Sequence, residues 1–421
     1  MLIDLFESAV RIQALREGPS GTLLDAFAQV LVRSGYAPLT ARRHLRSAEH
    51  FAHWADRRGM PVTGRIGPAL ERFRRHLQRG GRCRARGCRH FGHTFRLQIL
   101  HGARLFLEHL QDVGAIEASA VEPTDAAHPL ISGFCQWMRQ QRGTCTSTLS
   151  IYEAHIREIL ARLGDETGTW KAQSLRQFVL EGSRTRGWAT AKKRTTVLRM
   201  LLRFLIADGR CASELTGAVP VLAHWRLSSL PRYLSSDDVE RVIASCDVAA
   251  AVGKRDRAIL LLLARLGLRA GDIVQMQLHD IDWKGGWIHV TGKGRRETRL
   301  PLTREMGDAL VAYLTQGRPQ TDADTVFLCC RAPFRAFASH CAVSVIVDRA
   351  FARARVTRPS RGAAHLLRHS VATSMLRHGA SLHDVAALLR HRSVSTTEIY
   401  AKVDVTALRL IAQPWPEVQP C

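Results

Sequence analysis

The chain is poor in acidic residues and in lysine. Its 37 aspartates and glutamates face 61 basic residues, which gives a formal net charge of +24. Only seven of the basic residues are lysines, and the remaining 54 are arginines. A guanidinium pairs with phosphate through two parallel hydrogen bonds, so this excess favours nucleic acid as a partner. A codon bias toward arginine explains the choice of arginine over lysine, but not the surplus of bases over acids.

Long apolar segments are also missing. The longest apolar run, residues 258–264, is far shorter than the roughly 20 residues that a membrane helix needs. Residues 1–18 contain acidic side chains and no continuous apolar stretch, so we expect no secretory signal. The ten cysteines follow no regular spacing that indicates a disulfide framework. We therefore expect a cytoplasmic, nucleoid-associated protein without membrane contact.

Length and pattern predict a mainly α-helical chain of three domains with one small β-sheet or hairpin. Amphipathic helices fill residues 1–120, an N-terminal domain, and residues 130–222, a second helical domain. A strand–turn–strand pattern occurs only in residues 233–421, which we expect to form a mixed α+β domain with a C-terminal tail. Residues rich in proline and acidic side chains at 120–129 predict a linker between the first two domains.

The two helical domains share one sequence plan. Three segments of the first correspond in order to three of the second: 24–35 with 131–143, 39–59 with 147–164, and 93–114 with 189–209. This predicts two diverged copies of one helical module. The alternative is that amphipathic helices align with each other by chance.

Basic residues crowd around the start of a predicted helix at 188–194 in the second module. They are Arg184, Arg186, Lys192, Lys193, Arg194 and Arg199. A run of charge is usually only a solvated face. With the net charge of this chain, we predict that these side chains contact the phosphate backbone, which positions DNA without reading its sequence.

Four separated segments of the last domain carry residues suited to chemistry on a phosphate. They are LGLRAGD at 266–272, TGKG at 291–294, HLLRH at 365–369, and LLRH at 388–391 continued to TTEIY at 396–400. Arginines can hold the phosphate, histidines and lysine can move protons, and a tyrosine hydroxyl can attack phosphorus. TGKG lies between two strand-like segments, which predicts a β-hairpin with Lys293 at its tip.

In this order and spacing the segments resemble the tyrosine recombinase (phage integrase) family over residues 235–403. The resemblance implies that residues 130–222 are the family's helical core-binding domain, which binds DNA, and that residues 233–421 are its catalytic domain. The resemblance implies six catalytic residues: Arg269, Lys293, His365, Arg368, His391 and Tyr400. Tyr400 would attack a DNA phosphodiester, displace a 5′-hydroxyl and form a 3′-phosphotyrosyl bond. Arg269 and Arg368 would clamp the non-bridging oxygens, and Lys293 would protonate the leaving oxygen.

The remaining roles follow from the same resemblance. His365 would act in proton transfer at the tyrosine, and His391 would hydrogen-bond the phosphate. Asp272 would brace Arg269 through a salt bridge. No cofactor or metal is expected, because arginines supply the charge neutralisation that Mg²⁺ supplies in other phosphoryl-transfer enzymes.

Each residue alone has a plainer explanation. Arg269 could cap the end of a buried helix, where a cation is favoured, and His365 could cap its own helix. Lys293 could be an exposed turn residue, His391 a loop histidine and Tyr400 a core residue. Independent structural accidents do not reproduce six residue types in the order of one family, so we favour the catalytic reading.

The predicted function is site-specific DNA recombination by a tetramer bound to double-stranded DNA with inverted half-sites. The extended N-terminal region favours an integrase or transposase of a mobile element, with accessory recombinases or DNA-bending proteins as further partners. Two alternatives are a type IB topoisomerase-like nicking–closing enzyme and a catalytically inactive DNA-binding regulator.

Two features depart from the family or from known motifs. The family usually has glycine immediately before the position of His391, where this chain has Arg390. A second cluster places Cys83, Cys88, His90 and His93 close together. These are zinc-ligand residue types, but their spacing is not a standard one, so we expect a basic DNA-facing loop in preference to a zinc site.

Overall fold

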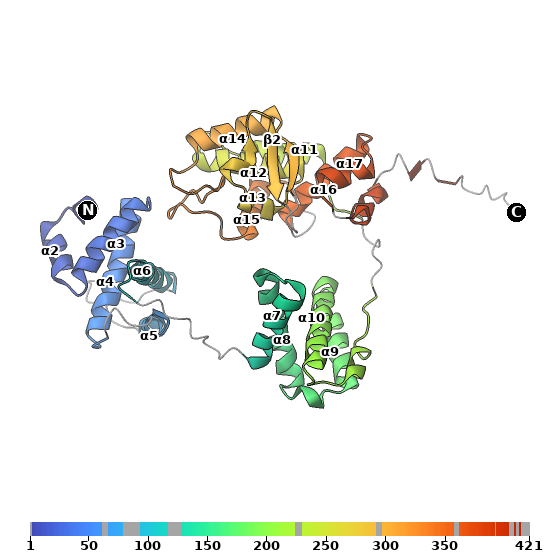
Figure 1. Cartoon of the computed structure of the whole chain (residues 1–421). Coiled ribbons are helices and arrows are strands. Elements are labelled where there is room, and N and C mark those ends of the chain that lie inside the picture. The colour runs from blue at the N-terminus through green and yellow to red at the C-terminus, as the bar shows by residue number, and fades with distance from the viewer. Residues whose placement is uncertain are drawn as a thin grey trace. The chain divides into compact units, whose positions relative to one another are not determined.

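The computed structural model describes residues 2–60, 66–78, 93–116, 128–223, 230–291, 297–357, 362–391, 393–403, 408–409 and 412–413. The fold is mainly helical with one three-stranded sheet, which confirms the predicted class (Figure 1). The chain divides into two compact units, residues 119–226 and the combination of 1–118 with 227–421. Among the described helices, none has the length and apolar character required to cross a membrane.

The first helical module is built on a core of aromatic and aliphatic side chains that all belong to residues 2–116. Its helices are α1 (Leu2–Leu5), α2 (Ala9–Glu17), α3 (Gly21–Arg33), α4 (Pro38–Asp56), α5 (Ile66–Gln78) and α6 (His93–Asp112). Phe27, Phe51 and Phe106 are almost completely buried in this core. Proline at the first position of α4 suits a helix start, because its missing N–H has no partner there in any helix.

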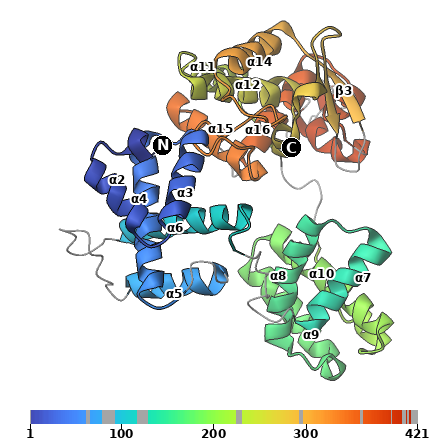
Figure 2. The same cartoon turned by 60° about the vertical axis from the view of Figure 1, so that its left-hand side comes forward.

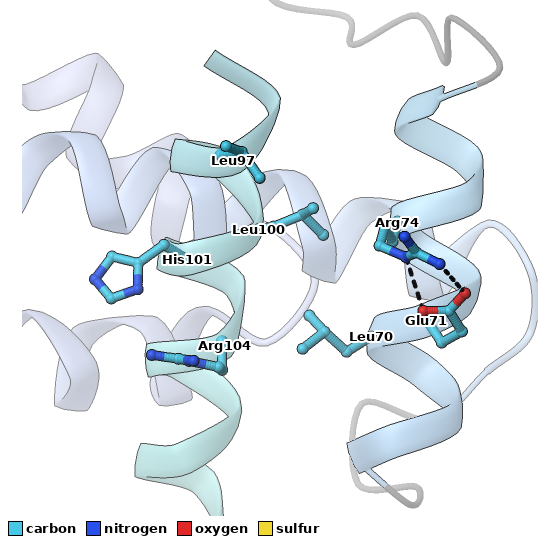
Figure 3. Close-up of a pocket in the computed structure, with 7 residues that line it drawn as sticks. All are labelled: Leu70, Glu71, Arg74, Leu97, Leu100, His101 and Arg104. Atoms are coloured by element: carbon cyan, nitrogen blue, oxygen red, sulfur yellow. Dashed lines mark hydrogen bonds and ion pairs between the residues drawn. The ribbon is translucent and has the colours of Figure 1, made fainter. Parts of the chain in front are cut away.

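Figure 3 shows how α5 packs on α6. Leu70 of α5 and Leu100 of α6 point into the space between the two helices, and Leu97 lines the same groove of about 340 Å³. On the outer side, Arg74 donates two hydrogen bonds to the Glu71 carboxylate at 2.7 and 2.8 Å. The junction is therefore apolar inside and charged at its rim, as expected for an amphipathic helix pair.

The second helical module has its own core within residues 130–222 (Figure 2). Its elements are α7 (Pro129–Arg142), α8 (Thr146–Leu163), η1 (Thr167–Thr169), α9 (Ala172–Thr185), α10 (Trp188–Ala207) and η2 (Ser213–Thr216). Helix α10 packs against α7, α8 and α9, so it forms the centre of the module.

The two modules share helix lengths and helix pairing. Helices α3 to α6 have 13, 19, 13 and 20 residues, and α7 to α10 have 14, 18, 14 and 20. In both, the fourth helix of the set packs on the other three, and the first packs on the second. Two copies of one module would show such a match. The duplication itself stays a prediction.

The last part of the chain surrounds the buried helix α12 (Ala251–Leu266), which packs against four other helices. The helices of this part are α11 (Ser236–Ala244), α12, α13 (Ala270–Gln275), α14 (Arg304–Gln316), α15 (His340–Ala354), α16 (Ala363–Arg377) and α17 (Leu382–Leu388). Three short 3-10 helices complete it: η3 (Leu278–Asp280), η4 (Val394–Thr396) and η5 (Glu398–Val403). The apolar run at residues 258–264 explains why this part of α12 is buried on all sides.

The predicted hairpin is present. Strand β2 (Trp287–Thr291) pairs antiparallel with β3 (Glu297–Pro301), and β1 (Ile281–Asp282) pairs with the other edge of β2. Ile288, Val290 and Leu300 alternate inward and join the core around α12. The sequence pattern also predicts a strand at 326–330, and this is wrong: Leu328 makes only an isolated bridge, to Ala336.

Two helices of the last domain begin at a serine that caps the helix N-terminus. Ser235 accepts a hydrogen bond from the backbone N–H of Asp238 at 3.1 Å and begins α11. Ser381 and Asp384 form a reciprocal capping box at the start of α17, which places Val385 and Leu389 in the small core around Tyr400. In both, a serine followed three residues later by an aspartate is a sequence pattern typical of a helix start.

Candidate active site

The turn after α12 leads to Arg269, the first arginine of the site. Gly267 ends the helix in the left-handed conformation with φ of 57°, which glycine adopts without steric cost. A Cβ at this position would lie 2.6 Å from a methyl carbon of Leu389. Glycine therefore permits both the turn and the close approach of the segment around Leu389, and the chain continues through Leu268 into Arg269.

Arg368 lies on α16 and is only 5% exposed. Its two terminal nitrogens donate to the carbonyl oxygens of Gly267 and Leu389. Burial, followed by the charges of Arg269 and Arg390, lowers the pKa of Arg368 to about 10. The side chain is thus held between the two segments that carry the other cations of the site, and it remains charged at neutral pH.

Asp272 contacts Arg269 differently from the prediction. Its carboxylate accepts a hydrogen bond of 2.7 Å from the backbone N–H of Arg269, and it forms its ion pair with Arg390. The expected salt bridge to the Arg269 side chain is therefore replaced by a salt bridge to Arg390. The Arg269 guanidinium donates to the carbonyl oxygen of Arg390 at 3.4 Å, which ties the same two segments together.

Tyr400, on η5, is buried with 2% exposure in a small core that includes Leu376 and Leu389. Its hydroxyl oxygen lies 2.6 Å from Nδ1 of His369 on α16. Burial raises the pKa of Tyr400 to about 12, against a smaller lowering effect of Arg368. Burial, with His365 and Arg368 nearby, lowers the pKa of His369 to about 4. At neutral pH the phenol is therefore the donor and the imidazole the acceptor.

The two predicted histidines both lie close enough to Arg368 for its charge to act on them. His391 shares a hydrogen bond of 2.8 Å between its Nδ1 and the hydroxyl of Thr397, and burial with nearby Arg368 lowers its pKa to about 4. Partial burial and the Arg368 charge also lower the pKa of His365. Both side chains are therefore neutral at pH 7, which leaves each imidazole able to donate through one nitrogen and accept through the other.

The structure thus brings Arg269, Asp272, His365, Arg368, His391 and Tyr400 into one cluster. Lys293 lies outside the described residues. So do Cys83, Cys88 and His90, together with the side chain of His93, so the preference for a basic loop over a zinc site stays a prediction.

The basic residues predicted to bind DNA divide into two groups. Arg184, Arg186, Lys192 and Lys193 are exposed at the start of α10 and the end of α9, although Arg186 also pairs with Glu158 at 2.5 Å. A groove of about 540 Å³ is lined by Arg184 and Arg186 at the end of α9, by Glu158 and Arg162 of α8, and by Arg194 of α10.

Arg194 and Arg199 serve the packing of their own module. Arg194 is only 6% exposed, lies 3.5 Å above the ring of Phe178, and pairs with Glu158 at 3.1 Å. Arg199 donates to the carbonyl oxygens of Val219 and Pro220. These contacts account for both side chains without DNA, so the structure does not support the interpretation of Arg194 and Arg199 as surface phosphate ligands.

Two residues of the cluster were not singled out from the sequence. His369 is the second histidine of HLLRH, and its i+4 spacing from His365 places both on one side of α16. Arg390 was noted only as a departure from the family. Its pairing with Asp272 joins positions 118 apart in the chain, and no local pattern predicts such a contact.

Known proteins match this chain in sequence and in fold. A family model described as the phage integrase family matches residues 232–406. The putative integrase/recombinase y4rA of Sinorhizobium fredii is 35% identical over 406 residues, which are 95% of this chain and 95% of that protein. Tyrosine recombinase XerD of Lacticaseibacillus casei is 28% identical over 278 residues, 65% of this chain and 93% of that protein.

Solved structures show the same fold. The XerH site-specific recombinase bound to palindromic difH substrate has a TM-score of 0.54 at 20% identity, covering 68% of this chain and 85% of that chain. A lambda integrase tetramer bound to a Holliday junction has a TM-score of 0.51 at 18% identity, covering 78% and 91%.

The helical fold with its small sheet and the full-length relative together define a site-specific tyrosine recombinase, an enzyme of DNA recombination. The chain belongs to the phage integrase family.

Proposed function

We propose that this recombinase cleaves and rejoins DNA with Tyr400 as its nucleophile. The observation that carries the proposal is the position of the Tyr400 hydroxyl, which is buried beside the arginine cluster and close enough to Arg368 for that charge to act on it. The phenol oxygen forms a bond to phosphorus as the bond from phosphorus to the 5′-oxygen breaks. The product is a 3′-phosphotyrosyl enzyme and a free 5′-hydroxyl, and reversal of the step rejoins the strand.

Arg269 and Arg368 neutralise the phosphate in this proposal. A five-coordinate phosphorus carries more charge on its non-bridging oxygens than the ground state, and fixed guanidinium groups stabilise that charge without reorganisation. The hydrogen bonds from Arg368 to Gly267 and Leu389 support the role, because they hold its side chain in one position before DNA binds. Lys293 protonates the leaving 5′-oxygen.

The histidines have separate tasks. With the Thr397 hydroxyl donating to Nδ1, the Nε2–H of His391 is free to donate to the phosphate. His369 contacts the tyrosine hydroxyl and stands where a proton acceptor is needed, a role that the sequence interpretation gave to His365. His365, close enough to Arg368 for that charge to act on it, then remains for phosphate binding.

Double-stranded DNA with inverted half-sites is the proposed substrate, and a tetramer is the proposed working assembly. Two observations support this: the related fold of XerH was solved with a palindromic substrate, and that of lambda integrase as a tetramer on a Holliday junction. The exposed Arg184, Lys192 and Lys193 of the second module would hold the phosphate backbone. An integrase or transposase role is favoured because y4rA, a putative integrase/recombinase, matches nearly the whole chain.

The test separates recombination from nicking and closing. Sites are first selected from random duplexes by binding to the full chain. Two duplexes carrying one selected site, with arms of different length, are then incubated with the protein. Recombination predicts two new products with exchanged arms. A type IB topoisomerase-like activity predicts relaxation of supercoiled DNA without exchanged arms, and an inactive regulator predicts neither.

A further inference from the structure

Arg390 is a buried cation whose hydrogen-bonding capacity is only partly used. Its side chain is 6% exposed, and one terminal nitrogen pairs with Asp272. Its Nε and its other terminal nitrogen are buried and have no hydrogen-bond partner among the described residues. Burying charged donors without partners costs stability, so such a site is expected to have a ligand.

The backbone at Arg390 is also specialised. Its φ of 51° lies in the left-handed region, which side-chain-bearing residues rarely adopt and glycine adopts freely. A glycine at this position, as the family usually has, would avoid the conformational cost. The chain carries an arginine there at the expense of local strain, which points to a task for the guanidinium.

The surroundings of Arg390 are those of the phosphate site. Its own carbonyl oxygen accepts from Arg269, and the preceding carbonyl, of Leu389, accepts from Arg368. Its charge is close enough to act on Arg368. Three guanidinium groups therefore meet one carboxylate, that of Asp272, and the cluster has an uncompensated charge of about +2 that suits a phosphate.

We propose that Arg390 is a third phosphate-binding arginine of the recombinase site. Asp272 fixes one side of its guanidinium, and the two unpartnered nitrogens donate to non-bridging oxygens of the scissile phosphate. Arg390 forms and breaks no covalent bond, and it stabilises the charge that develops as Tyr400 attacks phosphorus. The inference rests on the proposed function, in which Arg269 and Arg368 hold the same phosphate.

The competing interpretation is that Arg390 has only a structural role: it holds Asp272 in place, and Asp272 orders the start of α13. Such a structural contact matters equally for cleavage of a charged and of a neutral phosphate. A phosphate ligand matters most when the non-bridging oxygens are charged. A methylphosphonate at the scissile position replaces one charged oxygen with a neutral methyl group, so it separates the two interpretations.

The experiment measures single-turnover cleavage of a nicked suicide half-site that carries either phosphodiester or methylphosphonate. Arg390→Gly should cleave the phosphodiester about 100-fold more slowly than wild type, as loss of one transition-state donor does elsewhere. On methylphosphonate the same variant should lose less than about tenfold. Arg390→Lys should recover part of the loss through its single charge, whereas Arg390→Gln should not. Asp272→Asn keeps Arg390 in place and should be milder than Arg390→Gly.

Equal losses on the two substrates would show that Arg390 has only this structural role, and a glycine variant as fast as wild type would overturn the proposal outright. The lysine and glutamine variants decide the question if the glycine variant does not fold, since they differ in charge at similar length. Absence of an adduct with the wild-type chain on its selected site would contradict the proposed function as well, so the two failures are distinguishable.

Discussion

The hydroxyl oxygen of Tyr400 lies 2.6 Å from Nδ1 of His369, across 31 positions of the sequence. The contact joins η5 to α16, the helix that also carries Arg368. Burial keeps the tyrosine protonated, with a pKa of about 12, and keeps the histidine neutral, with a pKa of about 4. Before DNA binds, Tyr400 is therefore a protonated phenol whose hydroxyl already contacts its acceptor, Nδ1 of His369.

Removal of that acceptor should slow cleavage. In His369→Leu the phenol loses the imidazole placed to accept its proton, and a general base contributes about 100- to 10,000-fold in enzymes. We expect covalent adduct to form more slowly by about that factor. His369→Asn places an amide oxygen near the position of Nδ1, which can accept a hydrogen bond but not the proton, so it should stay closer to the leucine variant than to wild type. The measurement is the single-turnover rate on a suicide half-site.

Binding of the same DNA is the control for these variants, because His369 lies inside the site and has no proposed contact with the duplex. A leucine variant that cleaves at the wild-type rate would show that the contact with Tyr400 has no part in cleavage. An asparagine variant as fast as wild type would show that Nδ1 is needed only as a hydrogen-bond acceptor and not as a base.

The glycine at the end of α12 offers a matched pair for stability. Gly267→Ala forces alanine into the left-handed conformation, at about 1–2 kcal/mol, and pushes its Cβ against Leu389. Gly271→Ala, in α13, meets no atom within 4 Å and should be neutral or slightly stabilising. Urea unfolding of the full chain measures both. Equal stability of the two variants would contradict the described turn.

Buried histidines make the first helical module sensitive to acid. Burial, together with neighbouring His101 and Arg43, lowers the pKa of His44 to about 4, and burial with His76 does the same for His50. Between pH 6.5 and 4 the unfolded chain binds protons that the folded module does not. Stability is therefore fully present above pH 6.5 and falls as the pH drops, by about 2 kcal/mol for His44 at pH 5.

Hydrogen exchange of the α4 amides at pH 7 and pH 5, corrected for the intrinsic rate, measures this loss. His44→Leu removes one titrating group and should reduce the difference between the two pH values. The control is His279→Gln, at a highly exposed position of η3. Equal protection of α4 at both pH values in the wild type would refute the burial effect.

Salt dependence should separate the two groups of basic residues in the second module. Lys192→Ala and Lys193→Ala each remove one proposed phosphate contact, so the slope of log affinity against log salt should fall by about 0.9 for each. Arg210→Ala, beyond the other end of α10, should leave that slope unchanged. Arg194→Ala should instead lower stability by about 1–3 kcal/mol, because its side chain packs on Phe178 inside the module. An unchanged slope in both lysine variants would remove α10 from the interface.

Local sequence patterns predicted the elements that position the site. The capping pairs Ser235 with Asp238 and Ser381 with Asp384 follow from spacing alone, and the alternation of Ile288 and Val290 indicates the buried face of β2. Such signals depend on neighbours within four residues, so they can be recognised without knowledge of the fold.

Contacts between segments far apart in the chain could not be predicted from the sequence. Arg194 looked like part of a basic surface until its helix was placed against α9, where the same side of α10 is buried. The partner of Asp272 depends on how α17 ends beside α13, and the partner of Tyr400 depends on how η5 meets α16. The order of residues in the sequence identified the members of the cluster. Only the fold shows which of these side chains are hydrogen-bonded or ion-paired to each other.

The most direct test of the account is covalent trapping on a suicide half-site cut from a selected binding site. Wild-type protein should form a denaturation-resistant adduct with the 3′ end of the cleaved strand, and Tyr400→Phe should form none while it still binds the DNA. Tyr233→Phe, which removes a hydroxyl bonded to Arg377 outside the cluster, should trap DNA like wild type. An adduct with Tyr400→Phe, or a wild-type adduct mapped to another residue, would contradict the account.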